Sequence, residues 1–362
     1  MRKTVFRFAL SCTVVVAFAA TGSRAFGAEA EQKYSLSPSQ AAEGWLMLFD
    51  RESTYGWAAR GDYKWKVENG ILTCGAGKSL GLRTTSEFSN FTLRVEYRLP
   101  AGSKSAILYG MRPPQGAGSP SEPTPRVVEI VGKKGNQWQR AEINAQDVRG
   151  CIAIAGVPSL EIRSVLLKPT NMKAIFNGKD LTGWKPVEGA KLRSVFTVTP
   201  QGWLNIKDGP GDLQTVEQWK DFCLQLDILS STTGKALNSG VFFRAEPGKF
   251  WQGYEAQIRN EYSGGDRTKP VDFGTGAIYN RLAARKVVAD ENKWHTMTIV
   301  AAHNHIATWV NGYQVADYTD TNPPGSPREK KCRLEAGVIS LQGHDPTTNM
   351  SFRNIGIQAY PE

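Results

Sequence analysis

The stretch Asn238-Ser-Gly-Val-Phe-Phe-Arg244 alternates apolar and polar side chains at the two-residue period of a β-strand. The stretches Tyr254-Glu-Ala-Gln-Ile-Arg259 and Gly337-Val-Ile-Ser-Leu-Gln-Gly-His344 show the same alternation. The side chains expected to face a core are those of Val241, Phe243, Tyr254, Ala256, Ile258, Ile339 and Leu341. Those expected to share the opposite face are Asn238, Gly240, Phe242, Arg244, Glu255, Gln257, Arg259, Ser340, Gln342 and His344. The three stretches therefore predict antiparallel strands that cover a core with one face only.

The polar faces of these strands are rich in side chains that bind ligands or transfer protons. A solvated sheet face commonly carries Lys, Thr and Ser, whereas these faces carry Asn, Arg, Glu, Gln and His. Amides and guanidinium groups are strong hydrogen-bond donors, and Glu and His exchange protons. The pattern favours a binding or catalytic surface, and an ordinary solvated face of an antiparallel sheet is the alternative.

The rest of the sequence predicts an all-β fold. The 362 residues are 40% hydrophobic and include 36 Gly and 19 Pro, which is a turn-rich globular composition at a length that suits two domains. Short alternating runs are separated by Gly, Pro, Asn and Asp, and Asn311-Gly312 predicts a two-residue hairpin turn. Many strands with almost no helix indicate sandwiches of two antiparallel sheets.

The two halves of the chain carry the same series of signals. Phe49 and Phe176 each stand seven residues before a Gly-Trp pair, and Phe88-Ser-Asn-Phe91 corresponds to Trp219-Lys-Asp-Phe222. Self-similarity at this length indicates a duplicated domain rather than a short repeat. The predicted organisation is a domain over residues 43–168, a linker over residues 168–173 and a domain over residues 172–361.

The N-terminus predicts an exported protein. Residues 1–28 combine a basic start, an apolar run and small residues, which is the pattern of a cleaved signal peptide, so we expect a periplasmic or secreted location. Four basic residues and no acidic residue of this segment contribute to the formal net charge of +10, and no basic run comes after it. This balance argues against nucleic-acid binding. No later stretch is apolar enough to predict stable membrane insertion.

An ordered set of motifs in the second half resembles one known family. The motifs are Phe176-Asn-Gly-Lys-Asp-Leu-Thr-Gly-Trp184, residues 238–244, residues 254–257, Thr275-Gly-Ala-Ile-Tyr279, Asn311-Gly312, residues 341–344 and Phe352-Arg-Asn-Ile355. They resemble the 3-keto-disaccharide hydrolase family, also described as 3-keto-glycoside 1,2-lyases or 3-keto-2-hydroxy-glucal hydratases. The resemblance covers the second half almost end to end and the first half in part. It implies two tandem concanavalin A-like jelly-roll β-sandwiches, an exported bacterial setting, a carbohydrate ligand and a redox enzyme as the partner that supplies 3-keto sugars.

The resemblance implies cleavage of 3-keto-glycosides by proton abstraction beside the ketone, elimination of the group at C1 and addition of water. This chemistry needs a group that exchanges protons, a donor for the developing oxyanion and groups that bind hydroxyls. We expect Glu255 and His344 to transfer protons and Arg244 to stabilise the oxyanion, so these three are the predicted catalytic residues. The predicted substrate-binding residues are Asn238, Gln257, Tyr279 and Gln342.

Each of these assignments has a structural alternative. For Glu255 it is a buried ion pair with Arg244, and for His344 it is an exposed loop position. For Asn238 it is a β-bulge shared with Gly240, and for Tyr279 it is a place in the core. The other histidines are expected to be structural or at the surface, namely His295, His303 and His305.

The sequence leaves the cofactor and the level of activity open. Glu255 and His344 are the only candidates to bind a divalent metal ion, and two ligands do not make a site. The cysteines after residue 28 lack the CxxC spacing of zinc sites, and their disulfide pairing is left open; they are Cys74, Cys151, Cys223 and Cys332. Asn260 stands where the family often carries an acid. A non-catalytic, lectin-like glycan-binding protein is therefore the alternative to an enzyme, and a purely structural role is a third hypothesis.

The first half is predicted to be a degenerate copy without activity. It contains no His, and Val127-Val-Glu-Ile130 replaces the Glu-x-Gln stretch of the second half. The positions expected to correspond are Glu129 and Glu255, Ala106 and Gly240, and Gly110 and Arg244. We therefore expect any activity to reside in residues 172–361.

Overall fold

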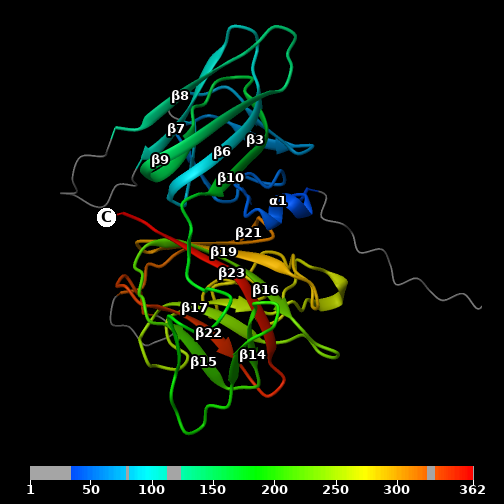
Figure 1. The fold of residues 1–362 in the computed structure, drawn as a ribbon. Coiled ribbons are helices and arrows are strands. Elements are labelled where there is room, and N and C mark those ends of the chain that lie inside the picture. The colour runs from blue at the N-terminus through cyan, green and yellow to red at the C-terminus, as the bar shows by residue number, and fades with distance from the viewer. Residues whose placement is uncertain (1–33, 79–80, 112–123, 324–330, 362) are drawn as a thin grey trace, which may run out of the picture. The chain divides into compact units, whose positions relative to one another are not determined.

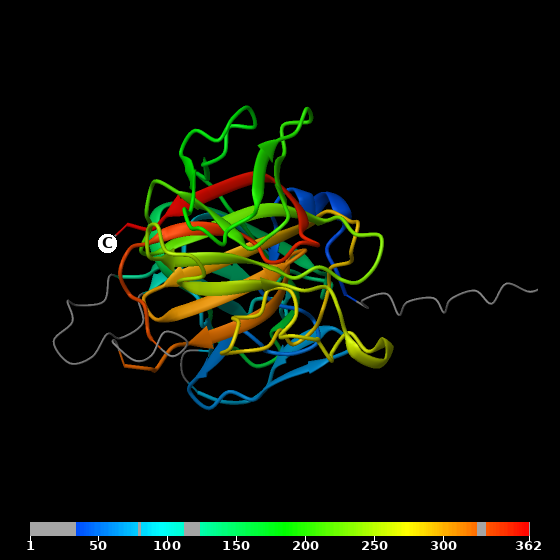
Figure 2. The ribbon, with the colours of Figure 1, turned by 90° about the horizontal axis from the view of Figure 1, so that it is seen from below.

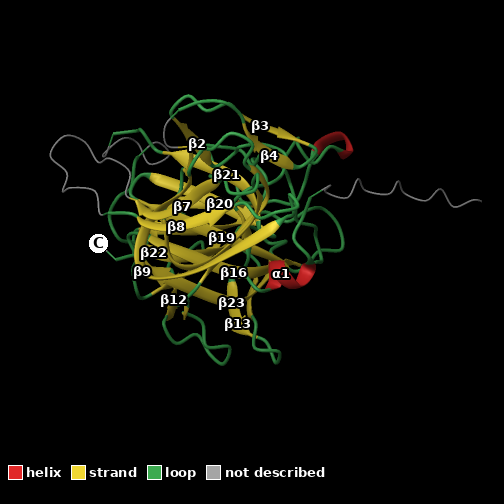
Figure 3. Cartoon of the chain, turned by 90° about the horizontal axis from the view of Figure 1, so that it is seen from above, coloured by secondary structure: helices red, strands yellow, loops and turns green. Residues whose placement is uncertain are grey.

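Nearly all of the regular secondary structure in the described chain is β-strand (Figure 3). The computed structural model describes residues 34–78, 81–111, 124–323 and 331–361, and the predicted signal segment, residues 1–28, lies outside them. Within these residues, α1 (Pro38–Ala42) begins at Ser37, whose hydroxyl accepts a hydrogen bond from the Gln40 backbone N–H. The 3-10 turn η1 (Ser263–Gly265) lies in the second half.

Ten strands of the first half form one sandwich, drawn in blue to green in Figure 1. They are β1 (Leu46–Met47), β2 (Trp57–Arg60), β3 (Trp65–Glu68), β4 (Ile71–Cys74), β5 (Gly81–Thr84), β6 (Phe88–Arg98), β7 (Lys104–Met111), β8 (Arg126–Val131), β9 (Gln139–Ile154) and β10 (Glu161–Pro169). Residues 139–150 of β9 pair with β6, whereas residues 151–154 pair with β5 and β7. This long strand therefore passes from one layer of the sandwich to the other.

The second half forms a second sandwich, which Figure 2 shows from below. Its strands are β11 (Lys173–Ala174), β12 (Trp184–Pro186), β13 (Val195–Val198), β14 (Leu204–Lys207), β15 (Gly211–Thr215), β16 (Phe222–Ser230), β17 (Ser239–Ala245), β18 (Tyr254–Ile258), β19 (His295–Ala302), β20 (His305–Val310), β21 (Tyr313–Thr319), β22 (Val338–Gly343) and β23 (Asn349–Ala359). One sheet has the order β12-β15-β22-β17-β18 and the other β13-β14-β23-β16-β19-β20-β21, with β11 beside β23. The prediction of two tandem all-β jelly-roll sandwiches is confirmed, and the predicted linker spans the end of β10 and the start of β11.

The predicted inward faces of β17, β18 and β22 lie in the core of the second sandwich. All seven side chains assigned to them are at most 1% exposed and belong to one hydrophobic cluster with residues of β16 and β19. Burial of each large aliphatic or aromatic side chain contributes about 1.5–3 kcal/mol to stability. The predicted hairpin turn also forms, because Asn311 and Gly312 join β20 to β21 with φ angles of 49° and 75°.

A β-bulge interrupts the alternation near the end of β17. The pairing with β22 shifts between Phe242 and Ala245, and Arg244 adopts a φ angle of 48°. A bulge adds one residue to one strand, so the residues beyond it change faces. Phe242 and Ala245 consequently pack together although they are three positions apart. The face predicted for Arg244 by simple alternation is therefore wrong.

Buried charges join the two sandwiches, and residues 34–362 form one compact unit. Arg149 of β9 contacts Glu87 at 2.9 Å and Asp221 of the second sandwich at 2.5 Å. Trp309 donates from Nε1 to the Met47 carbonyl oxygen at 3.2 Å. Burial alone would raise the pKa of Asp221, but the Arg149 and Arg244 guanidinium groups hold it below its usual range.

The four cysteines after the predicted signal segment are all buried and none is in a disulfide. In the part of the chain that the structure describes, no helix is both long and apolar enough to span a membrane.

Candidate functional site

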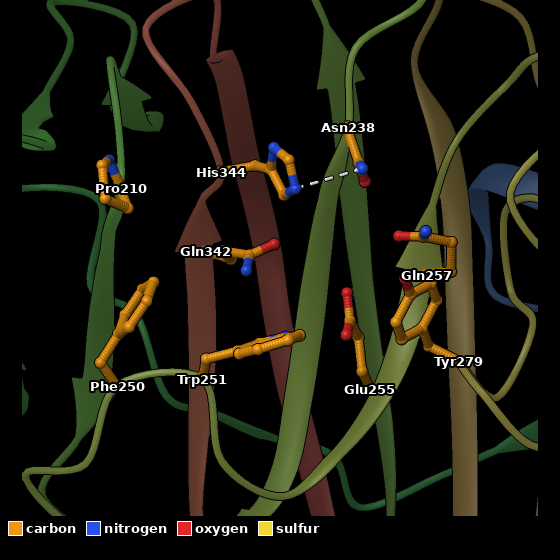
Figure 4. Close-up of a pocket in the computed structure, with 9 residues that line it drawn as sticks. All are labelled: Pro210, Asn238, Phe250, Trp251, Glu255, Gln257, Tyr279, Gln342 and His344. Atoms are coloured by element: carbon orange, nitrogen blue, oxygen red, sulfur yellow. Dashed lines mark hydrogen bonds between the residues drawn. The ribbon is translucent and has the colours of Figure 1, made fainter. Parts of the chain in front are cut away.

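A cavity of about 230 Å³ opens on the outward face of the five-stranded sheet (Figure 4). It is lined by Pro210, Asn238, Phe250, Trp251, Glu255, Gln257, Tyr279, Gln342 and His344. Six of the seven site residues predicted from the sequence line the cavity, and Arg244 is the exception. Pro210, Phe250 and Trp251 line the cavity but were not predicted. The volume is below the roughly 300–1,000 Å³ of drug-sized ligand sites, so the cavity suits a single small ring.

Glu255 lies on the wall of the cavity because of its place in β18. It pairs with Phe242 in register, two residues along the strand from the pair of Gln257 and Gly240, and the residue is only 7% exposed. A Cβ atom on Gly240 would lie 2.8 Å from Cγ and 2.9 Å from Cδ of Glu255. Gly240 therefore provides the space that the carboxylate occupies, and the bulge of β17 lies further along the strand.

Arg244 does not belong to the cavity. Its guanidinium donates to the carbonyl oxygens of Lys220 at 2.6 Å, His303 at 2.6 Å and Arg333 at 2.7 Å, and contacts Asp221 at 2.9 Å. The side chain has no solvent exposure. The bulge turns it away from the polar face, and its partner is Asp221 rather than Glu255. We therefore remove Arg244 from the candidate site and assign it a structural role.

His344 comes directly after β22 and reaches the cavity with one edge of its ring. Nε2 lies 3.3 Å from Nδ2 of Asn238, and Nδ1 lies 2.9 Å from Oδ2 of Asp345. The backbone N–H of His344 donates to the Thr348 hydroxyl at 3.0 Å, which fixes the start of this loop. The side chain is 41% exposed. His344 is therefore an exposed loop residue, which was the alternative considered from the sequence, and it also lines the cavity.

Gln257 is engaged within the protein. It is 1% exposed; its amide nitrogen donates to the Asp272 carboxylate at 3.2 Å and carbonyl at 3.1 Å, and its Oε1 accepts from the Ile258 N–H. These bonds suit support of the cavity wall more than binding of a sugar hydroxyl. Asp272 and Asp345 lie in loops. Their places at the site could therefore not be predicted from strand periodicity.

Two buried acceptor atoms of the site have no hydrogen-bond partner among the described residues. They are Oδ1 of Asn238 and Oε1 of Gln342, a residue that is 3% exposed. Buried polar atoms are nearly always paired, so such orphans point to water or a ligand. Sugar hydroxyls are donors that match both atoms.

Two aromatic residues of the loop between β17 and β18 form the lower wall in Figure 4. They are Phe250 and Trp251, and the backbone N–H of Trp251 donates to the Asp212 carboxylate at 2.8 Å. Gln214 accepts from the Gly248 N–H at 2.8 Å and donates to the Lys249 carbonyl at 3.0 Å. Trp251 is held in place although it is 39% exposed, and an exposed, fixed indole suits stacking on a sugar ring.

Tyr279 closes the side of the cavity next to Glu255 (Figure 4). Its ring contacts Phe273 edge to face, with centroids 5.1 Å apart. Burial raises the pKa of Tyr279, and the carboxylates of Asp272 and Glu255 act in the same direction. The hydroxyl therefore stays protonated and can donate a hydrogen bond.

The sequence profile of the 3-keto-alpha-glucoside-1,2-lyase-like domain matches residues 44–138 and 171–358, which is more than half of the chain. The chain belongs to this family. The resemblance drawn from the ordered motifs is thereby confirmed, and family and cavity together indicate a carbohydrate-active, glycosyl hydrolase-like protein.

Several solved structures are similar to parts of this lyase-like chain. A proposed glycosyl hydrolase from Parabacteroides distasonis is 20% identical over 52% of this chain and 94% of its own, with a TM-score of 0.43. A second one from the same organism is 25% identical over 53% and 100%, with a TM-score of 0.41. The carbohydrate-binding module CBM66 from Bacillus subtilis is 17% identical over 51% and 99%, with a TM-score of 0.36. No curated protein matches the chain.

The strand pairing of the first sandwich differs from the correspondence that we expected from the sequences of the two halves. In the second sandwich Gly240 pairs with Gln257, whereas in the first sandwich Ala106 pairs with Glu129. Glu129 therefore corresponds to Gln257, and Val127 takes the place of Glu255. The expected correspondence of Glu129 with Glu255 is wrong, because the strands β7 and β8 are joined by a longer connection than β17 and β18.

Asn260, which stands where the resemblance led us to expect an acid, is not among the residues that line the cavity. It is 6% exposed, and its Oδ1 accepts a short hydrogen bond from the Thr275 hydroxyl. A nearby acid comes from elsewhere: burial raises the pKa of Glu291 to about 7, and this carboxyl interacts with Asn260. Asn260 therefore contacts Thr275 and Glu291 and is not part of the cavity lining.

The described residues contain no group of three or more His, Cys, Asp and Glu side chains that could hold a metal ion. Glu255 and His344 both line the cavity, as predicted, but no third ligand of these types joins them among the described residues. We assign no metal ligands in this lyase-like protein and derive no step through a metal.

Proposed function

We propose that the protein cleaves 3-keto-glycosides by elimination and rehydration, in the cavity of the second sandwich. One observation carries the proposal: a carboxylate from β18 and the imidazole of the residue after β22 line one cavity with three amides and a fixed indole. Family membership supports the same reaction class. A purely structural sheet face has no use for this set of proton-transfer groups.

The reaction assigns different steps to Glu255 and His344. Glu255 takes the acidified proton from C2; the C2 electron pair forms the C1=C2 double bond, the C1–O bond breaks, and the leaving oxygen takes up the proton. Water then adds across the double bond: His344 accepts a proton from water as the water oxygen bonds C1, and the protonated imidazole passes this proton to C2. The net reaction consumes one water and releases the 3-keto sugar and an alcohol.

The remaining lining residues bind and orient the ring. The Tyr279 hydroxyl and the Gln342 amide are the donors available for the C3 oxygen, in place of Arg244. Trp251 stacks on the sugar face, and the orphan oxygens of Asn238 and Gln342 accept from hydroxyls. A polar cleft of about 690 Å³, which shares Asn238 with the cavity, offers room for the leaving group.

Turnover of a chromogenic 3-keto-glucoside tests the proposal, with the unoxidised glucoside as the control substrate. We expect release of the chromophore from the keto substrate only. His344→Gln should still release the chromophore but accumulate the unsaturated 2-hydroxy-glucal, because only the addition of water is impaired. No turnover of the keto substrate by the wild-type protein, with or without added divalent metal ions, would refute the proposal.

A non-catalytic glycan-binding role is the second candidate. The exposed Trp251 and the departure at Asn260 favour it. Calorimetry with unoxidised oligosaccharides separates the two functions: saturable binding without any product identifies a lectin-like protein, whereas product from the keto substrate identifies the enzyme.

The setting of the reaction is also a proposal. Residues 1–28 support export, and a ketone at C3 must come from a dehydrogenation, so a redox enzyme acting before this protein is the partner class we propose. A fusion of residues 1–28 to a periplasmic reporter checks the export signal directly.

A further inference from the structure

Asp272 lies behind the cavity in a loop of uncommon backbone conformation. Asp272 and Phe273 have φ angles of 47° and 69°, so two successive residues with side chains adopt the left-handed region. The loop is held by the Val271 N–H, which donates to Glu261 O at 2.9 Å, and by the Ala284 N–H, which donates to Phe273 O at 2.9 Å. Such strained residues concentrate at functional sites, where the surrounding structure enforces them.

The carboxylate of Asp272 fixes the orientation of two amides of the site. Its Oδ2 lies 3.1 Å from Nδ2 of Asn238 and 3.2 Å from Nε2 of Gln257. An ionised carboxylate only accepts hydrogen bonds, so each amide must turn its nitrogen toward Asp272. This contact determines which end of the Asn238 amide is nitrogen and which is oxygen.

The same Asn238 nitrogen also faces His344. It carries two hydrogens, one for Asp272 and one for Nε2 of His344 at 3.3 Å. An amide N–H only donates, so Nε2 must accept with its lone pair. On the other side of the ring, Asp345 accepts from Nδ1 at 2.9 Å. Both neighbours of the imidazole therefore require the tautomer with hydrogen on Nδ1.

We propose that Asp272 is a positioning residue that, through Asn238, holds His344 in the tautomer with hydrogen on Nδ1 and the lone pair on Nε2. In this tautomer Nε2 can accept a proton from water once water takes the place of the Asn238 N–H, which is the step assigned to His344; that use rests on the proposed function. The hydrogen-bond chain from Asp272 through Asn238 to His344 does not depend on the proposed function, because it is present in the protein without ligand. Without Asp272 the Asn238 amide is free to turn its oxygen toward the ring and to stabilise the opposite tautomer.

Nitrogen-15 NMR of the histidine side chains in the free, full-length mature protein tests the chain without any substrate. Asp272→Gly removes the carboxylate and suits a positive φ, whereas Asp272→Asn keeps one acceptor oxygen and also tolerates this backbone. We expect the Nδ1–H tautomer in the wild type and in Asp272→Asn, and a mixture of both tautomers in Asp272→Gly. His344→Gln identifies the signal of His344 among the four histidines.

Asn238→Ala breaks the chain at its middle and leaves the strained loop intact. Asp345 still accepts from Nδ1 in this variant, so the tautomers should shift in the same direction as in Asp272→Gly but by less. For rehydration we expect a loss of about 10–100-fold in Asp272→Gly, the range seen when second-layer partners are removed, and recovery to within a few-fold in Asp272→Asn. An unchanged His344 tautomer in both Asp272→Gly and Asn238→Ala would overturn the inference. A shifted tautomer in a protein that turns over no keto substrate would support the inference and refute the proposed function.

Discussion

The two sandwiches present the same backbone at the same place and different chemistry on it. β7 pairs with β8 and β9 as β17 pairs with β18 and β22, and both strands carry a bulge with a positive φ, at Gly110 and at Arg244. Ser105 and Ser239 even make the same bond, each donating to the carbonyl of the neighbouring strand, at Ala155 and Gln342. The scaffold and the site are therefore separate properties of this fold.

When the two sandwiches are aligned on these shared strand pairs, a different residue stands in the first sandwich at each polar position of the cavity. Where the second carries Asn238, Glu255, Gln257, Gln342 and His344, the first carries Lys104, Val127, Glu129, Ala155 and Val157. Lys104 and Glu129 form an exposed ion pair at 2.9 Å, and Val127 is 59% exposed. This face has no His and no carboxylate at the position of Glu255, and we therefore propose that the activity resides in the second sandwich.

The largest expected effect comes from the carboxylate of the cavity. Glu255→Gln keeps size and some hydrogen bonding but cannot take a proton, so release of the leaving group should fall by about 10²–10⁴-fold while sugar binding largely survives. Glu129→Gln is the matched change in the first sandwich and should leave the rate unchanged. Steady-state kinetics and calorimetry measure both. Equal losses in the two variants, at unchanged folding stability, would contradict the assignment.

Substitution of Arg244 at the bulge of the second sandwich should lower the free energy of unfolding far more than loss of an exposed ion pair in the first sandwich. Arg244→Gly copies the residue found at Gly110, and its φ suits glycine, so the measured effect is the loss of the buried guanidinium. Removing one partner of a buried ion pair costs about 3–5 kcal/mol of unfolding free energy. Lys104→Ala, which breaks an exposed pair, should cost less than about 1 kcal/mol. Urea unfolding compares them, and similar costs would show that Arg244 is not structural.

The part of the pH dependence of stability that comes from histidines should arise in the second sandwich, since the first has no His. Burial lowers the pKa of His295 to about 4 from 6.5, so the unfolded chain binds this proton first and stability falls as pH drops from about 6.5 to about 4. Burial raises the pKa of Glu291 to about 7 from 4.5, so its contribution is lost as pH rises from about 4.5 to about 7. The two effects oppose each other.

Glu291→Gln should therefore uncover the effect of His295. We expect the unfolding free energy of this variant to rise with pH between about 4 and 6.5, by at most about 1.4 kcal/mol per pH unit for one proton, where the wild type is flatter. His303, whose pKa burial also lowers, adds in the same direction. Chemical unfolding at several pH values measures the slope, with Glu129→Gln as the control. Identical profiles for Glu291→Gln and the wild type would show that Glu291 is not protonated at neutral pH.

The smallest expected effect concerns the aromatic wall, for which the first half has no counterpart in its sequence. The connection of β17 to β18, residues 246–253, holds Phe250 and Trp251, whereas residues 112–125 contain no aromatic residue. Trp251→Ala should weaken substrate binding by about 0.5–1.5 kcal/mol and leave stability unchanged, because the indole is partly exposed. Trp138→Ala in the first sandwich should not alter binding. An unchanged KM in Trp251→Ala would exclude stacking.

Strand periodicity was sufficient to predict the residues of regular strands, but not strand pairing or the loops. Alternation placed Glu255, Gln257 and Gln342 on one face because each sits within a regular strand. It failed at Arg244, since a bulge changes faces without a sequence signal of its own. It also misaligned Glu129, because register is set by pairing partners and not by equal spacing along the chain. Loop residues such as Trp251 have no period from which their position can be predicted.

A crystal structure of Glu255→Gln with a bound 3-keto-glucoside tests the central claim most directly. We predict that the sugar lies in the cavity of the second sandwich, stacked on Trp251, with C2 within hydrogen-bond range of residue 255 and C1 toward His344. A sugar bound on the β7–β8 face of the first sandwich, or bound in the cavity with C2 turned away from residue 255, would contradict it.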